Sequence, residues 1–198
     1  MNTEIDVRHE RIRDQVLDAF EARCSESGPR AVSMASLVAQ LGISTKTLYR
    51  LYASKNDILV ALMQRWAHGS ALRQQEGLAT GLAPQQRITD AALVWLQTHS
   101  RFSAQFWREL ARDFPDAQSV YAQEYQAFLQ RSRSNLIGDI REDLKPDLAL
   151  SCLMALIRHA TEPAVHTAVK LDRAEALVQA IDLWSVGALR SSSVSALS

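Results

Sequence analysis

Residues 33–55, SMASLVAQLGISTKTLYRLYASK, decide the fold of this chain. Apolar residues at helical spacing predict a short helix over Met34–Leu41 and a second one over Thr45–Leu51. Between them, Gly42 can adopt the positive φ that a tight turn needs, and Ile43 is expected to fill the space between the helices. This order predicts a helix-turn-helix, the motif whose second helix can enter the major groove of DNA.

The second helix of the pair is rich in polar side chains. Only Leu48 and Leu51 are plainly apolar, so the helix has little surface with which to pack. Hydroxyl, phenol, ammonium and guanidinium groups suit base edges and phosphates, and an ordinary solvated helix is the alternative interpretation. The residues predicted to contact DNA, two of them as helix caps, are Ser33, Ser44, Thr45, Lys46, Thr47, Tyr49, Arg50 and Lys55.

The charge pattern supports contact with DNA in this segment. The whole chain has 22 basic and 22 acidic residues and a formal net charge of zero. No acidic residue occurs between Glu26 and Asp57, although Arg30, Lys46, Arg50 and Lys55 lie there. Because DNA responds to local positive charge, the neutral total does not argue against binding.

Composition predicts an all-α protein. With 198 residues, seven glycines and five prolines, the chain lacks persistent strand-like alternation and is typical of a soluble protein of one or two domains. No apolar run is long enough to cross a bilayer and the N-terminus resembles no secretion signal, so we expect a cytoplasmic protein without a membrane partner. Cys24 and Cys152 match no zinc spacing and are expected to be apolar core residues.

Helical periodicity extends along the rest of the chain. We expect a first helix over residues 8–27, a fourth over 55–72, and a domain boundary in the glycine-containing stretch 76–84. Further helices are expected over 85–99, 103–113, 117–139, 147–161 and 173–189. The predicted domains are a DNA-binding domain over 1–72, with its core at 8–55 and the fourth helix as connector, a larger helical domain over 73–190, and a disordered tail over 191–198.

The N-terminal segment resembles the DNA-binding domain of TetR/AcrR-type transcriptional regulators over about residues 10–66. The residues that carry the resemblance are Val16 to Ala19, Gly28, Ser33 to Ser44, Thr47 to Tyr49, Tyr52, Ser54 and Lys55. The resemblance implies a homodimeric regulator, usually a repressor, that leaves its operator when a small molecule binds the larger domain. By position it implies that Ser33 and Lys55 contact phosphate. Ser36 replaces a frequent acidic capping partner, which predicts a weaker cap at Ser33.

The larger domain is expected to bind an effector that is partly apolar or aromatic. Aromatic residues at helical spacing are usually core, but a pocket in a helical bundle would draw on them. The candidates are Trp95, His99, Phe106, Trp107, Tyr125 and His159. The histidines lack a metal-binding spacing, so neither a metal site nor a cofactor is predicted.

The last two long helices carry apolar residues on several faces, which indicates burial in their own domain or against another chain. They predict a four-helix dimer interface that includes Leu153, Leu156, Ile157, Leu177, Ile181 and Trp184.

An enzyme and a helical protein-binding adaptor are the rival functions. The sequence contains no nucleophile elbow, phosphate-binding loop or metal-ligand set, and an adaptor would not explain the basic helix pair.

Overall fold

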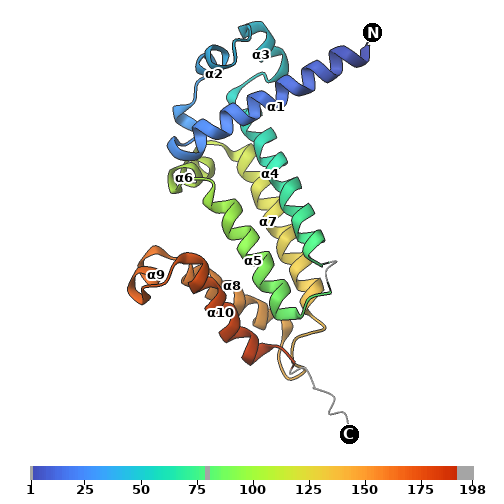
Figure 1. Cartoon of the computed structure of the whole chain (residues 1–198), viewed down its shortest axis with the longest axis vertical. Helices are drawn as coiled ribbons and strands as arrows, with labels where there is room; N and C mark the ends of the chain where they lie inside the picture. The colour runs from blue at the N-terminus through green and yellow to red at the C-terminus, as the bar shows by residue number, and fades with distance from the viewer. Residues whose placement is uncertain (1, 79–80, 191–198) are drawn as a thin grey trace. The chain divides into compact units, whose positions relative to one another are not determined.

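The structure, a computed structural model, describes residues 2–78 and 81–190 and is built from helices (Figure 1). The α-helices are α1 (Asn2–Ser27), α2 (Met34–Leu41), α3 (Thr45–Leu51), α4 (Lys55–Leu78), α5 (Pro84–Ser100), α6 (Ala104–Asp113), α7 (Pro115–Leu136), α8 (Pro146–Ala160), α9 (Pro163–Val169) and α10 (Arg173–Ala188). A single 3₁₀ turn, η1 (Pro29–Ala31), lies between α1 and α2. The predicted all-α class is confirmed for the described residues. The expected tail over 191–198 lies outside them.

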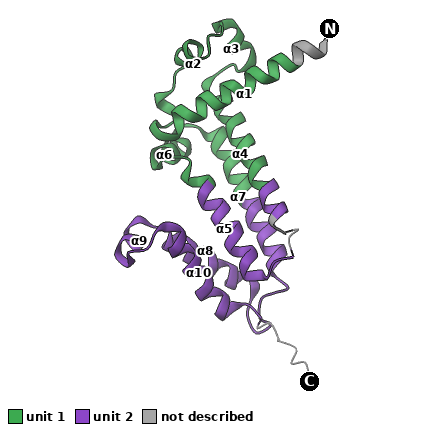
Figure 2. Cartoon of the chain, viewed as in Figure 1, with its two compact units in different colours: residues 1–71, 98–125 green, residues 72–97, 126–198 purple. Residues whose placement is uncertain are grey.

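The chain divides into two compact units (Figure 2). The first unit combines residues 1–71 with 98–125, and the second combines 72–97 with 126–198. Each unit has its own hydrophobic core. The units are therefore not the consecutive segments 1–72 and 73–190, because residues 98–125 pack with the N-terminal segment. An effector domain over 73–190 stays a prediction.

The first core gathers apolar residues of α1 to α4 around a segment from later in the chain. Val16, Phe20 and Cys24 form the buried stripe of α1, as expected from their spacing. Phe106 and Leu110 of α6 are fully buried in the same core. Burial raises the pKa of the Cys24 thiol to about 12, which makes it an inert filler. The expectation for Cys152 was wrong, since this side chain is exposed on α8.

The second core is built chiefly by α8 and α10, which pack closely against each other. The buried Trp184 Nε1 donates to the Ala149 carbonyl oxygen over 2.8 Å. Asp172 begins α10 with a complete capping box to Glu175. This cap and this hydrogen bond add to the apolar packing of α8 against α10.

Two elements differ from the sequence expectation. Helix α4 continues past residue 72 to Leu78 and crosses part of the predicted boundary at 76–84. One glycine costs a helix only about 1 kcal/mol, and Gln74 anchors this part of α4 by donating to Ser132 Oγ over 3.2 Å. The short helix α9 was not predicted, because its seven residues carry too little periodicity to stand out. None of the described helices is both long and apolar enough to cross a membrane.

Candidate DNA-binding surface

Helix α2 is capped at its start as the sequence indicates. Ser33 has an extended backbone, and its Oγ accepts from the Ser36 N–H over 3.1 Å. In return, the Ser36 Oγ accepts from the Ser33 N–H over 3.3 Å, which completes a capping box. The Ser36 hydroxyl therefore takes the place of the acidic partner, and the lower strength expected of this cap stays a prediction.

The turn places α3 directly after α2. Gly42 lies in the left-handed region, with φ 62° and ψ 25°, and ends α2. Ser44 then begins α3, since its Oγ accepts from the Thr47 N–H over 3.0 Å and also lies 2.8 Å from the Thr47 Oγ1. The bounds of both helices agree with the sequence prediction, because caps and turns are local signals.

Helix α3 has one buried and one exposed face. Leu48 is fully buried and Leu51 nearly so, and both belong to the first core. Thr45, Lys46, Tyr49 and Arg50 are exposed, whereas Thr47 is half-buried beside its cap. Tyr49 leaves 50% of its surface to solvent, which is high for a large aromatic side chain. A short, exposed, cationic helix face of this kind suits a DNA groove, and contact of each side chain with DNA stays a prediction.

Two of the predicted DNA-contacting cations already have partners within the chain. Arg50 Nη2 donates to His9 Nε2 over 2.6 Å, and since guanidinium has no acceptor, this His9 nitrogen must accept. Lys55 Nζ donates to the Arg30 carbonyl oxygen over 3.2 Å and lies 5.8 Å from the centre of the Phe114 ring. The His9 contact joins α1 to α3 and could not be predicted from the sequence, because the two residues are 41 positions apart.

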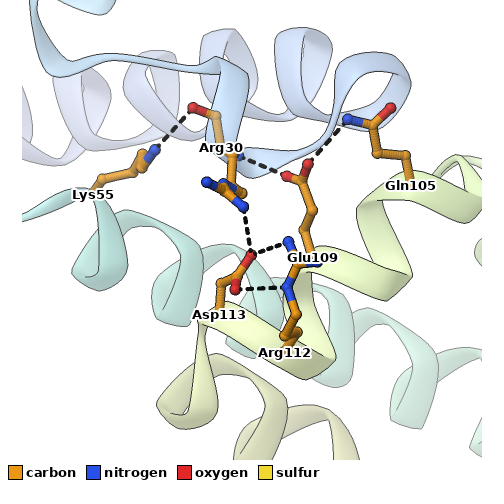
Figure 3. Close-up of polar contacts among 6 residues, drawn as sticks. All are labelled: Arg30, Lys55, Gln105, Glu109, Arg112 and Asp113. Atoms are coloured by element: carbon orange, nitrogen blue, oxygen red, sulfur yellow. Dashed lines mark hydrogen bonds and ion pairs between the residues drawn. The ribbon is translucent and has the colours of Figure 1, made fainter.

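An acidic group from a distant part of the chain lies next to this surface (Figure 3). Glu109 of α6 accepts a hydrogen bond from the backbone N–H of Arg30 in η1 over 2.8 Å. The guanidinium of Arg30 pairs with Asp113 over 3.6 Å. The segment free of acidic residues in sequence is therefore not free of them in space.

Partial burial is the main cause that lowers the pKa of the Lys55 ammonium, and the negative charge of Glu109 opposes this shift. A buried ammonium without such a neighbour would lose more of its proton affinity. Glu109 therefore helps to keep Lys55 cationic, which contact with phosphate requires.

Three of the expected ligand-binding residues meet in an aromatic cluster in the first unit. We use "aromatic cluster" for Trp66, His99, Trp107, Tyr121 and Tyr125. The His99 and Trp107 rings stack with centroids 4.8 Å apart, and Tyr121 stacks on Tyr125 at 6.4 Å. His99 Nε2 lies 3.0 Å from the Tyr121 hydroxyl. Burial raises the pKa of Tyr121 to about 12, so its hydroxyl keeps its proton. Trp66 and Tyr121 were missed because their spacing is equally typical of core residues.

One polar atom of the aromatic cluster stands out. Trp66 is 9% exposed, and its Nε1–H is buried without a hydrogen-bond partner among the described residues. A buried donor of this kind usually has an acceptor, which a bound molecule can supply.

The other ligand candidates lie elsewhere. Phe106 is fully buried in the first core and stacks on Phe102 at 4.2 Å, which makes it a packing residue. Trp95 and His159 belong to the second unit. His159 is exposed on α8, 3.8 Å from the Glu162 carboxylate. Helical spacing cannot tell which unit a residue joins.

The expected dimer residues mostly serve the second core instead. Five of the six are buried there and Leu156 is partly buried against it, so they are packing residues of the subunit. The buried five are Leu153, Ile157, Leu177, Ile181 and Trp184. Apolar side chains that do reach the surface of α8 and α10 are Leu148, Leu183 and Val186, which we call the exposed apolar surface.

The helix-turn-helix segment matches a known family, whereas the remainder of the chain is compared through its fold. Residues 16–62 match the family model described as bacterial regulatory proteins of the tetR family. No curated protein sequence matches the chain.

Solved structures share the fold over most of the chain. A transcriptional regulator from Saccharomonospora viridis in complex with choline is 19% identical and has a TM-score of 0.72. The match covers 91% of this chain and 99% of that chain. SmeT, the repressor of the multidrug efflux pump SmeDEF of Stenotrophomonas maltophilia, is 16% identical with a TM-score of 0.64 and 91% of each chain covered. A TetR-family transcriptional regulator from Mesorhizobium loti is 14% identical with a TM-score of 0.68 and covers 92% of this chain and 99% of its own. At these identities the similarity shows the fold alone.

The family match covers the same α2, Gly42 and α3 arrangement that the geometry assigns to a helix-turn-helix. The segment beyond it shares only the all-helical fold with the similar structures. Residues 16–62 therefore form a helix-turn-helix segment of the tetR family of bacterial regulatory proteins, and the chain shares its fold with solved TetR-family transcriptional regulators.

Proposed function

We propose that this regulator is a repressor that binds a palindromic operator as a homodimer and leaves it when a small molecule binds. The observation that carries the proposal is the exposed face of α3. Lys46, Tyr49 and Arg50 lie on this face, and the buried Leu48 and Leu51 hold the helix in place from its other side. Lys46 and Arg50 can donate to guanine or phosphate, and Tyr49 can donate to a phosphate oxygen.

A dimer is part of the proposal because a palindrome presents two related half-sites. Two copies of α3 related by a two-fold axis would lie about 34–36 Å apart, which is one turn of DNA. The exposed apolar surface (Leu148, Leu183 and Val186) supports a contact between the α8 and α10 helices of two subunits. Large apolar side chains exposed to solvent are frequent at protein interfaces.

The effector is proposed to bind at the aromatic cluster, with an acceptor atom facing the Trp66 Nε1–H. One similar structure holds choline, a quaternary ammonium compound. Aromatic faces attract such cations, so choline and aromatic quaternary ammonium compounds are the first ligands to test. Release of DNA then requires that the ligand binds the DNA-free form of the protein more tightly than the DNA-bound form. The coupling free energy is commonly about 1–3 kcal/mol.

Binding to a specific duplex tests the DNA-binding part of the proposal. A duplex selected from a random library should bind the wild type tightly, and Lys46→Gln together with Tyr49→Ala should weaken binding by at least about tenfold, as expected when base and phosphate contacts are lost. The plot of log affinity against log salt should become shallower by about 0.9 for each lost phosphate contact. Fluorescence anisotropy over a salt series measures both quantities.

Lys145→Gln is the matched control for charge, because Lys145 is also exposed but lies in the second unit. It should leave the affinity and the salt slope unchanged within about twofold. Equal affinity of the wild type for the selected duplex and for random duplexes would contradict the proposal.

Thermal unfolding with candidate ligands tests the effector site. A ligand at about one hundred times its dissociation constant adds about 2.7 kcal/mol to the free energy of unfolding and raises Tm. The same ligand should weaken operator binding by about 5- to 150-fold. Trp66→Phe keeps the ring but removes the N–H, and should reduce the Tm shift. A compound that raises Tm through the aromatic cluster but leaves operator affinity unchanged would refute this assignment.

A further inference from the structure

Glu109 of α6 is a buried carboxylate that lies far from η1 in sequence but next to it in space (Figure 3). Only 8% of its surface is exposed. Glu109 Oε2 accepts from the Arg30 N–H over 2.8 Å, and Glu109 Oε1 accepts from Gln105 Nε2 over 3.0 Å. Glutamate is rarely buried unless its charge is compensated, so this residue needs a specific explanation.

The chain is shaped to receive this carboxylate. Gly28 has φ 79°, and a Cβ there would lie 2.5 Å from Glu109 Oε2. Burial by itself would raise the pKa of Glu109, but the hydrogen bonds from Gln105 and Arg30 and the charge of Arg30 outweigh it, so the pKa lies below its ordinary value. Glu109 is therefore an anion at neutral pH.

The backbone of Arg30 is held from both ends. Its N–H donates to Glu109, and its carbonyl oxygen accepts from Lys55 Nζ over 3.2 Å. Lys55 is the first residue of α4 and one of the expected phosphate contacts. A shift of η1 would therefore move the acceptor that holds the ammonium of Lys55.

We infer that Glu109 is a positioning residue for DNA binding: by holding the Arg30 backbone from α6, it sets where Lys55 presents its ammonium to phosphate. This inference rests on the proposed DNA binding. Charge alone would not favour a carboxylate here, because an anion near DNA repels the phosphates. Glu109 instead acts through its hydrogen bond to η1, which links α6 to the predicted DNA-contacting residues within the first unit.

A comparison of two carboxylates on the same helix separates position from charge. Glu109→Gln keeps the size of the side chain but removes the charge, and should weaken operator binding about three- to tenfold, a loss typical of a coupled neighbour. Asp113→Asn removes an equal charge from a residue whose ion pairs, within the described part of the chain, are with the side chains of Arg30 and Arg112. It should leave binding unchanged or slightly tighter, because exposed pairs contribute little.

A double-mutant cycle tests whether Glu109 acts through Lys55. In a Lys55→Ala background, Glu109→Gln should change operator affinity by less than about twofold, because the group that it positions is absent. Gln105→Ala is a milder second variant that keeps the carboxylate charged but removes one of its donors, and should weaken binding in the same direction. Urea unfolding of each variant identifies any loss that comes from misfolding.

The outcomes separate the inference from the proposed function. If the wild type shows no sequence-specific binding, the proposed function fails. If the wild type binds but Glu109→Gln matches Asp113→Asn, or has the same effect with and without Lys55, the positioning role is overturned. A loss in Glu109→Gln that disappears in the Lys55→Ala background supports it.

Discussion

Replacing Leu183 and Val186 with glutamate is expected to convert the protein from dimer to monomer and to abolish measurable operator binding. These side chains are 72% and 86% exposed in the subunit, and in the proposed dimer they are buried against the partner. Burying glutamates across a two-fold axis places like charges together without compensation, which costs several kcal/mol. A monomer holds only one half-site at a time, so affinity should fall by at least about a hundredfold.

Light scattering after size-exclusion chromatography measures the oligomeric state, and anisotropy measures binding to the selected duplex. Because both residues are exposed in the subunit, circular dichroism should show an unchanged helix content and a change in unfolding free energy within about 0.5 kcal/mol. Leu72→Glu is the matched control, since Leu72 is an exposed apolar residue of α4, outside α8 and α10. A dimer that survives both glutamates would refute the proposed interface.

Gly28→Ala should destabilise the first unit by about 2.5–6 kcal/mol. With φ 79° and ψ 158°, Gly28 lies in a region that is nearly restricted to glycine, and an alanine there costs about 1–3 kcal/mol in strain. The added Cβ would also displace the Glu109 carboxylate and break its hydrogen bond to Arg30, which costs about 1.5–3 kcal/mol for a charged acceptor. Urea unfolding measures the loss, and operator affinity should fall with it because Lys55 loses its positioned partner.

Gly42→Ala separates these two causes. Gly42 also has a positive φ, at 62°, but a Cβ there meets nothing within 4 Å. It should therefore show the strain alone, about 1 kcal/mol, without a clash. In a Glu109→Ala background, the cost of Gly28→Ala should shrink to its own strain of about 1–3 kcal/mol. If Gly28→Ala proves no more costly than Gly42→Ala, the close approach of Glu109 does not hold η1 in place.

The helix-turn-helix could be predicted well because its signals are local. Ser33 and Ser44 act as caps within three residues of their partners, and Gly42 adopts its conformation without help from distant residues. The bounds of α2 and α3 follow from these positions. The alternation of Leu48 and Leu51 with polar residues likewise identifies the buried and exposed faces of α3.

The predicted dimer and ligand residues were less successful for a common reason. A helix that is apolar on several faces has more than one way to bury them, and spacing does not say which face meets its own unit. Leu177 and Ile181 proved to be core, and Val186 proved to be exposed. Phe106 and His159 belong to different units, although both were predicted to line the ligand pocket.

By itself, the sequence of this protein determined its helical class, its helix-turn-helix and the family to which that segment belongs. Caps, turns and amphipathic faces act over a few residues, so they can be read along the chain. Only the tertiary structure decided which residues meet across long separations. Arg30 and Glu109 are 79 positions apart, and no periodic signal in the sequence indicates their contact. It forms because packing of α6 on α1 and η1 brings a buried carboxylate to an unpaired backbone N–H, and burial makes that hydrogen bond obligatory.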